Sequence, residues 1–174
     1  MKNQKTKSRL AVAALTALMT VAGCGGDSSR GGGHSRNELD CMMRAIFFEA
    51  NRSSREGMIA VGSVVMNRVE SPEFPNTVCG VVGQKGQFAP GIMTRPMESK
   101  ALPDVREAAI AVLRGERQPG VQNAMFFHTQ GYSFPYDNMH YVLVAGGNAF
   151  YEKRRSHLVT QPVPPTPIER RRGY

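Results

Sequence analysis

The stretch from Cys41 to Val69 constrains the fold most, because its pattern predicts two consecutive helices with one acidic side chain at the end of the first. In the first helix, Met42, Ile46 and Glu49 fall within about 60° of one another on a helical wheel. Glu49 therefore occupies the apolar stripe, where packing alone would favour a leucine. Burial and the negative end of the helix dipole both disfavour a charged carboxylate, so we expect the pKa of Glu49 to be raised.

A raised carboxyl pKa is the property that a general acid needs if it is to work near neutral pH. The residues alone leave a second interpretation open, in which Glu49 reaches the surface or pairs with Arg52, three positions further on. Structural ion pairs also perturb pKa values, so periodicity does not decide between a catalytic and a structural carboxylate.

Several motifs follow one another in a fixed order from Glu49 onward. The chain reads E-A-N-R-S-S-R-E-G-M-I-A-V-G-S-V-V-M-N-R-V, and then G-Q-F-A-P, A-M-F-F-H and G-G-N-A-F-Y. This succession resembles the SleB/CwlJ-type cell-wall hydrolases, a family of peptidoglycan-cleaving enzymes whose motif runs approximately E-A-R-G-E-x-x-E-G-x-x-A-V-x-x-V-x-x-N-R-V. The resemblance covers about residues 39–151.

The resemblance implies a small, lysozyme-like single domain of the α+β class, with helices first and a short β-hairpin near the C-terminus. It also implies cleavage of the β-1,4 bond between N-acetylmuramic acid and N-acetylglucosamine in peptidoglycan glycan strands, with Glu49 as the catalytic residue. A single carboxylate acting first as acid and then as base suits a lytic transglycosylase, and no cofactor or metal is required. Hydrolysis by water stays open, as does a non-catalytic glycan-binding envelope lipoprotein.

The family motifs also imply a set of substrate-binding residues. An amide offers hydrogen bonds to sugar hydroxyl and acetamido groups, and an aromatic face suits a pyranose ring. From the residues alone, a loop phenylalanine is more often a core anchor, and a histidine after an apolar run is more often a hydrogen-bonded structural residue. The expected substrate-binding residues are Gln87, Phe88, His128, Asn148 and Tyr151.

Two positions depart from the family pattern. Ser53 stands where the family has a second acidic residue, and Asn148 stands where it usually has histidine. Both departures favour the non-catalytic alternative. Glu49 on the apolar stripe argues against it, because burying an acid costs free energy and a protein that only binds glycan gains nothing from that cost.

The N-terminal sequence has the layout of a secretory signal. A basic start is followed by an apolar or small run from Leu10 to Gly23 that is short for a membrane span. The run ends V-A-G-C, which resembles a bacterial lipobox with Cys24 as the lipidated residue; cleavage near Ala22, with Cys24 free, is the alternative. We expect an exported protein, anchored by this lipid in the cell envelope and facing the periplasm, with Gly25 favouring the outer membrane.

Composition divides the chain further. Residues 25–36 are Gly- and Ser-rich, as in a tether, and the sequence from Lys153 onward is basic and proline-rich, as in disordered tails. The predicted organisation is a signal peptide (1–23), a tether (24–36), a catalytic domain (37–152) and a disordered tail (153–174).

With Cys24 assigned to lipid, Cys41 and Cys79 remain, an even pair in an oxidising compartment. We therefore expect a disulfide between the first helix and the segment after the second. A zinc site is the competing idea, but no pair of Cys or His residues has ligand spacing.

The formal net charge of +8 belongs to the ends of the chain. Residues 1–23 carry four basic and no acidic side chains, and residues 153–174 carry six basic and one acidic, which leaves about −1 for residues 24–152. A nucleic-acid-binding protein needs a basic face on the fold itself, so the sequence argues against a nucleic-acid partner.

Turn and cap signals place the other elements. The S-x-x-E pattern from Ser53 to Glu56 predicts the start of the second helix, and Arg68 near its end is either an exposed terminal group or lies beside the substrate groove. A third helix is expected from about Asp104 to Gly115. A buried strand is expected at 124–128, and a hairpin at 140–151 that turns at two consecutive glycines.

Overall fold

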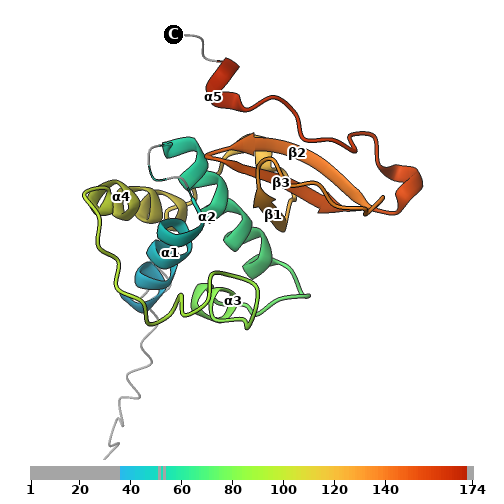
Figure 1. Ribbon diagram of the computed structural model, residues 1–174. Helices are drawn as coiled ribbons and strands as arrows, with labels where there is room; N and C mark the ends of the chain where they lie inside the picture. The colour runs from blue at the N-terminus through green and yellow to red at the C-terminus, as the bar shows by residue number, and fades with distance from the viewer. Residues whose placement is uncertain (1–35, 51, 53, 172–174) are drawn as a thin grey trace, which may run out of the picture. The chain divides into compact units, whose positions relative to one another are not determined.

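The computed structural model describes residues 36–50, 52 and 54–171, which fold as an α+β domain with helices first and a sheet after them (Figure 1). The helices are α1 (Arg36–Glu49), α2 (Arg55–Glu70), α3 (Val78–Val82) and α4 (Leu102–Leu113). The turn η1 (Pro119–Val121) leads to strands β1 (Phe126–Thr129), β2 (Met139–Ala145) and β3 (Asn148–Lys153), followed by η2 (Ser156–Leu158) and α5 (Ile168–Arg171). The predicted class and order of elements are confirmed.

Helix α1 packs against α2, α3 and α4 and forms the centre of the helical layer. Met42 and Ile46 on its predicted apolar stripe are fully buried. The predicted core positions Met58, Val61 and Val65 of α2 are buried as well. Helical periodicity therefore identified the faces that pack together.

The N-terminal cap of α2 lies one residue later than the sequence pattern predicted. Ser54 is the capping residue, and its hydroxyl accepts a hydrogen bond from the amide of Gly57 at 3.1 Å. Glu56 is then the second residue of the helix and not the third, so the expected capping box is wrong in register. Ser53 lies outside the described residues.

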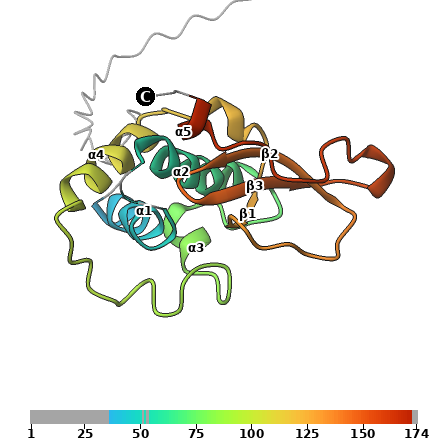
Figure 2. The same ribbon diagram turned by 45° about the horizontal axis from the view of Figure 1, so that its top comes forward.

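The sheet is antiparallel throughout, in the order β1-β3-β2. Strands β2 and β3 form the predicted hairpin, and both turn residues, Gly146 and Gly147, have positive φ, at 55° and 79°. Two such residues are what a two-residue hairpin turn of the favoured hand requires. Gly146 lies against Gly57 of α2 so closely that a side chain on either has no room, and this contact docks the sheet beside α2 (Figure 2).

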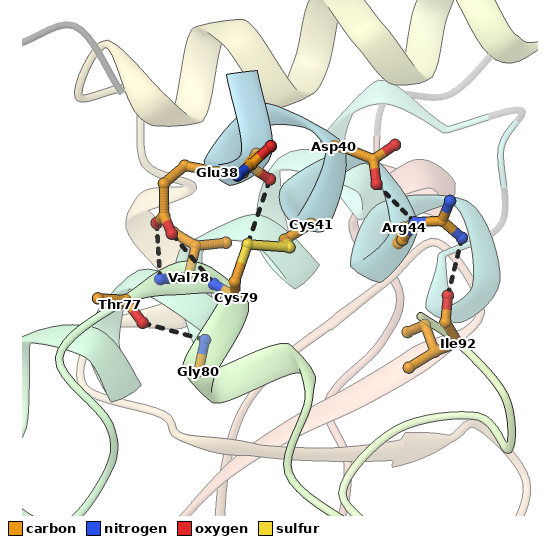
Figure 3. The surroundings of a disulfide bond; sticks show 10 residues. Glu38, Asp40, Cys41, Arg44, Thr77, Val78, Cys79, Gly80 and Ile92 are labelled. Atoms are coloured by element: carbon orange, nitrogen blue, oxygen red, sulfur yellow. Dashed lines mark hydrogen bonds and ion pairs between the residues drawn. A yellow bond between two sulfur atoms is a disulfide. The ribbon is translucent and has the colours of Figure 1, made fainter. Parts of the chain in front are cut away.

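Helix α1 is tied to α3 at its N-terminal end (Figure 3). Cys41 and Cys79 form the predicted disulfide, with their Cα atoms 5.1 Å apart. Close by, the Glu38 carboxylate accepts hydrogen bonds from the amides of Val78 at 2.8 Å and Cys79 at 3.4 Å. A carboxylate at the start of a helix satisfies amides that have no partner within the helix.

The loop after α3 is also fastened to α1 further along. The Arg44 guanidinium donates to the carbonyl of Ile92 at 3.1 Å and pairs with Asp40 at 2.7 Å (Figure 3). It also donates to the carbonyl of Arg95 at 2.9 Å. Together with the disulfide, these contacts hold residues 79–95 against α1 on both sides of the predicted substrate loop.

The segment after β3 differs from the disorder expected from its composition. Residues 154–161 run along β2, where the amide of Tyr141 donates to the carbonyl of Gln161 at 2.9 Å. Further on, the Glu169 carboxylate accepts from the Ser54 hydroxyl at 2.8 Å and the Gly146 amide at 2.6 Å. The reason is that β2 is an edge strand, whose unpaired backbone groups offer partners to an extended segment.

No helix in the described part of the chain is both long and apolar enough to cross a membrane. The predicted signal peptide, the tether up to Ser35, and Cys24 lie outside the described residues.

Candidate active site

Glu49 is the last residue of α1, and its side chain is half-buried. Its Oε1 accepts a hydrogen bond at 2.7 Å from the amide of Ala89, which belongs to the loop after α3 that is fastened to α1, called here the anchored loop. Burial raises the pKa of Glu49, and this effect is opposed by the Ala89 hydrogen bond and by the positive charge of Arg68. The predicted direction of the shift is confirmed, and desolvation is its principal cause.

The competing ion pair between Glu49 and Arg52 is not formed. Arg52 instead donates to the carbonyl of Phe47 at 2.9 Å, and its guanidinium lies 4.5 Å from the centre of the Phe47 ring. Arg52, which lies beyond the end of α1, thus does not pair with Glu49, and Glu49 faces open space.

That space is a pocket of about 450 Å³. It is lined by the end of α1, by Arg68 of α2, by residues 86–88 of the anchored loop, by β1 with the loop that follows it, and by the first residue of β3. Among the described residues of this lining, Glu49 is the only acidic one. Four of the five predicted substrate-binding residues belong to it: Gln87, Phe88, His128 and Asn148.

Asn148 is buried and bonds to the protein itself. Its amide nitrogen donates to the backbone carbonyl of Glu49 at 2.6 Å. The last carbonyls of a helix lack partners within it, so this bond satisfies one of them and holds the end of α1 in place. Asn148 therefore positions Glu49, and a contact between Asn148 and substrate stays a prediction.

Both ring nitrogens of His128 also have partners within the protein. Nδ1 lies 2.9 Å from the carbonyl of Thr129 and Nε2 lies 2.9 Å from the hydroxyl of Tyr141. Because a carbonyl only accepts, the contact with Thr129 places a proton on Nδ1, while Nε2 is paired with the Tyr141 hydroxyl. His128 forms a fixed part of the pocket wall, as the family resemblance implied, while its nitrogens have the structural partners expected of a lone histidine.

Tyr151, the fifth predicted residue, lies behind the wall and is absent from the pocket lining. Its ring packs against those of Phe126, Tyr141 and His128, with centroids 5.6, 5.7 and 5.9 Å away. Burial raises the pKa of Tyr151, so it is a neutral phenol at ordinary pH. The ring of Tyr151 supports β1, and a contact between Tyr151 and substrate stays a prediction.

Arg68 is the cation of the site, and its side chain is buried (3% exposed). Its Nε donates to the carbonyl of Met125 at 2.7 Å, whereas Nη1 has no hydrogen-bond partner. The guanidinium lies 5.2 Å from the ring centre of Phe74 and 5.3 Å from that of Phe88. Burial lowers the pKa of Arg68 to about 10, against the opposing influence of Tyr151 and Glu49, so Arg68 remains charged at neutral pH.

The model of one protein family, described as Cell Wall Hydrolase, matches residues 52–151. The protein belongs to the Cell Wall Hydrolase family. The predicted membership is confirmed, and the match spans α2 through most of β3. Glu49 lies three residues before the matched segment, so its role rests on the geometry of the site.

Curated relatives of this Cell Wall Hydrolase protein include two spore cortex-lytic enzymes. That of Bacillus subtilis (strain 168) is 35% identical over 88 residues, which are 48% of this chain and 27% of the relative. That of Oceanobacillus iheyensis is 34% identical over 98 residues, 55% of this chain and 33% of the relative. The chain thus matches about a third of the length of these relatives.

Two solved structures have a similar fold. The catalytic domain of the germination-specific lytic transglycosylase SleB from Bacillus anthracis superposes with a TM-score of 0.57 at 25% identity, covering 69% of this chain and 98% of that domain. The catalytic domain of the Bacillus cereus SleB protein gives a TM-score of 0.58 at 24% identity, over 74% of this chain and 99% of that domain. The α+β fold is therefore that of the SleB catalytic domain.

Sequence reasoning left the position of Arg68 undecided, although a signal was present. Val61, Val65 and Arg68 recur at helical spacing, which puts a cation on the buried face of α2, just as Glu49 puts an acid on that of α1. Tyr132 and Phe134 also line the pocket. They follow β1 in a loop whose path the sequence did not reveal.

Proposed function

We propose that the protein cleaves the β-1,4 bond between N-acetylmuramic acid and N-acetylglucosamine in peptidoglycan, as a lytic transglycosylase with Glu49 as general acid and base. The observation that carries this proposal is a half-buried carboxyl with a raised pKa, opening into a pocket of about 450 Å³ in a cell wall hydrolase domain. A raised pKa keeps the carboxyl protonated closer to neutral pH.

In the first step, protonated Glu49 donates its proton to the bridging oxygen as the bond from that oxygen to the anomeric carbon of the muramoyl sugar breaks. The departing chain leaves with a 4-hydroxyl group, and the muramoyl ring carries oxocarbenium character. Glu49 is now a carboxylate. Its negative charge is stabilised by the Ala89 amide and by Arg68, the two groups that favour the charged form in this structure.

In the second step, the 6-hydroxyl of the same muramoyl sugar attacks its own anomeric carbon and gives its proton to Glu49. The product is a 1,6-anhydro sugar, and the acid is regenerated. Most glycosidases use two carboxylates, whereas Glu49 is the only acidic side chain that the described part of the chain contributes to this pocket. One group that serves in turn as acid and base fits that composition.

The test is digestion of purified peptidoglycan by the protein and by Glu49→Gln, with soluble products identified by mass spectrometry. We expect muropeptides ending in 1,6-anhydro-muramic acid from the unaltered protein and none from the variant. Products with reducing muramic acid ends would show that the reaction at this site is hydrolysis and not transglycosylation. Glycan binding without any cleavage would leave a non-catalytic envelope protein.

We further propose that the protein is exported and anchored through lipid on Cys24. A disulfide between Cys41 and Cys79 is consistent with an oxidising compartment, and the enzyme's substrate lies outside the cytoplasm. We expect Cys24→Ala to release the protein from the membrane fraction into the soluble envelope fraction. An unchanged membrane association would contradict the lipid anchor.

A further inference from the structure

The loop between β1 and β2 exposes an unusual number of aromatic rings. Tyr132, Phe134 and Tyr136 are 67%, 44% and 65% exposed, and they make up half of the large hydrophobic side chains that are exposed in the described part of the chain. Exposed apolar surface that gathers in one place marks an interaction site more often than isolated exposed residues do.

These rings are arranged as a surface. They occur at every second residue, a spacing that places side chains on one side wherever the backbone is extended. The rings of Phe134 and Tyr136 are stacked, with an angle of 9° between their planes and centroids 6.1 Å apart. We name Tyr132, Phe134 and Tyr136 the aromatic ledge.

The ledge rests on a fixed base. Phe134 meets the His128 ring edge to face, with centroids 4.9 Å apart. His128 is itself held on β1 by hydrogen bonds to Thr129 and Tyr141. A binding surface that is already ordered before its ligand arrives loses less entropy on binding. The fixed position of these rings is therefore more typical of a ligand-binding surface than of apolar groups exposed by chance.

The ledge is continuous with the catalytic pocket. Tyr132 and Phe134 line the same pocket as Glu49, and Tyr136, stacked on Phe134, carries the aromatic surface outward past the pocket lining. A polymer that is bound with one bond at Glu49 and leaves the pocket past Tyr132 and Phe134 would pass over Tyr136.

From this geometry we propose that the aromatic ledge binds the glycan strand beyond the bond that is cut, by stacking against the faces of its sugar rings. The proposal rests on the proposed function, which supplies the polymer. Flat rings suit the apolar face of a pyranose, while the two tyrosine hydroxyls suit its hydroxyl rim. That mixture of flat apolar faces and polar edges fits a carbohydrate better than a lipid surface.

The test compares Tyr136→Ala, which removes the outer ring, with Tyr136→Phe, which keeps it. Leu158→Ala is the matched control, since Leu158 in η2 is 52% exposed and absent from the pocket lining. One readout is KM and kcat on peptidoglycan. The other is sedimentation with insoluble peptidoglycan, with each change made in the Glu49→Gln protein so that binding is measured without cleavage.

We expect Tyr136→Ala to raise KM and the dissociation constant about fivefold, the scale of one aromatic stacking contact, and to leave kcat nearly unchanged. Tyr136→Phe keeps the stacking face and loses only the hydroxyl, so its effect should be smaller than that of Tyr136→Ala, whereas Leu158→Ala should match the parent protein. The proposed role of the ledge would be wrong if Tyr136→Ala and its parent bound peptidoglycan equally. It would also be wrong if Leu158→Ala lost as much binding as Tyr136→Ala. Because sedimentation needs no turnover, failure of the ledge and failure of the proposed catalysis give different results.

Discussion

The two ends of α1 each carry a glutamate that accepts a backbone amide from the segment after α2, yet their surroundings differ. At the N-terminal end, Glu38 bonds to two amides of α3 beside a disulfide. At the C-terminal end, Glu49 bonds through one oxygen to Ala89 and faces a pocket. One end of the helix is thus fastened to α3, and the other presents an acid to the pocket.

The difference shows that residue type and helix position do not by themselves define a catalytic acid. Both glutamates are part of the contact between α1 and the chain that follows α2. Glu49 differs because α1 ends there on its apolar stripe, so the carboxyl is partly desolvated while the space in front of it stays open. An open, desolvated carboxyl is available to a substrate, whereas one surrounded by helix amides is not.

The sharpest test of this contrast is a pair of isosteric substitutions. We expect Glu49→Gln to lower the rate of peptidoglycan cleavage by about 10²- to 10⁴-fold, the range for loss of a general acid. Glu38→Gln should leave the rate of the folded protein unchanged and lower stability by about 1 kcal/mol, because it weakens hydrogen bonds to α3. The rates are measured as release of soluble muropeptides. Equal losses of cleavage rate in the two variants would show that the two glutamates do not differ in function.

The disulfide stabilises the N-terminal end of α1 against unfolding. Cys41 and Cys79 are 38 residues apart, and replacing both by serine should cost about 2–4 kcal/mol, mainly by freeing the unfolded chain. Urea unfolding under oxidising conditions measures this loss. Cleavage by the fraction that remains folded should persist, and an unchanged unfolding midpoint would show that the disulfide contributes little.

Asn148 stabilises the C-terminal end of α1, as the disulfide stabilises the N-terminal end, but with a smaller expected effect. Asn148→Ala leaves the carbonyl of Glu49 without its buried donor, so we expect a loss of about 1–3 kcal/mol in unfolding free energy and a fall in kcat. The exposed amide variant Asn123→Ala serves as the control. If both variants unfold at the same urea concentration, the bond to Glu49 is not supporting the helix end.

Arg68 tunes the acid through its charge. Its cation favours the Glu49 carboxylate and so lowers the pKa of Glu49. Activity needs the protonated acid, and kcat/KM therefore falls as pH rises through that pKa. Arg68→Met removes the cation, raises the pKa of Glu49 further, and should move the alkaline limb of the pH profile to higher pH. A shift to lower pH, or an equal shift with the exposed variant Arg114→Met, would contradict this.

The raised pKa of Glu49 also predicts how stability changes with pH. A group whose pKa is higher in the folded state favours folding at pH values below its unfolded pKa, and this contribution is lost as pH rises through the folded pKa. Glu49→Gln should therefore be more stable than the unaltered protein at pH 8, with the difference vanishing near pH 4. Thermal unfolding at both values measures this, and a less stable variant at pH 8 would show that the carboxylate is favourably paired.

Much of the fold was open to prediction because its signals are local. Helical periodicity predicted the buried faces of α1 and α2, and two consecutive glycines between apolar runs predicted the hairpin. The even pair of cysteines left after Cys24 was assigned to lipid predicted the disulfide. Glu49 was found by the same periodicity, since an acid on an apolar stripe conflicts with packing.

What the sequence did not reveal depends on partners far along the chain. Ser54 and not Ser53 caps α2, and the same Ser54 hydroxyl reaches Glu169, 115 residues away. The C-terminal segment looked disordered because its composition is basic and proline-rich, but its order comes from the free edge of β2. Likewise, the sequence pattern predicted that Tyr151 lies on a strand, but it did not predict which face of that strand borders the pocket.

The most direct test of the central claim is a titration of the Glu49 carboxyl carbon by NMR, assigned through Glu49→Gln and run beside the pH dependence of kcat/KM. We expect this carboxyl to titrate above its ordinary value of 4.5, and activity to fall through the same pH. A carboxyl that titrates at or below the ordinary value, with activity persisting well above it, would show that Glu49 is a structural acid like Glu38 and that the bond is broken by another group.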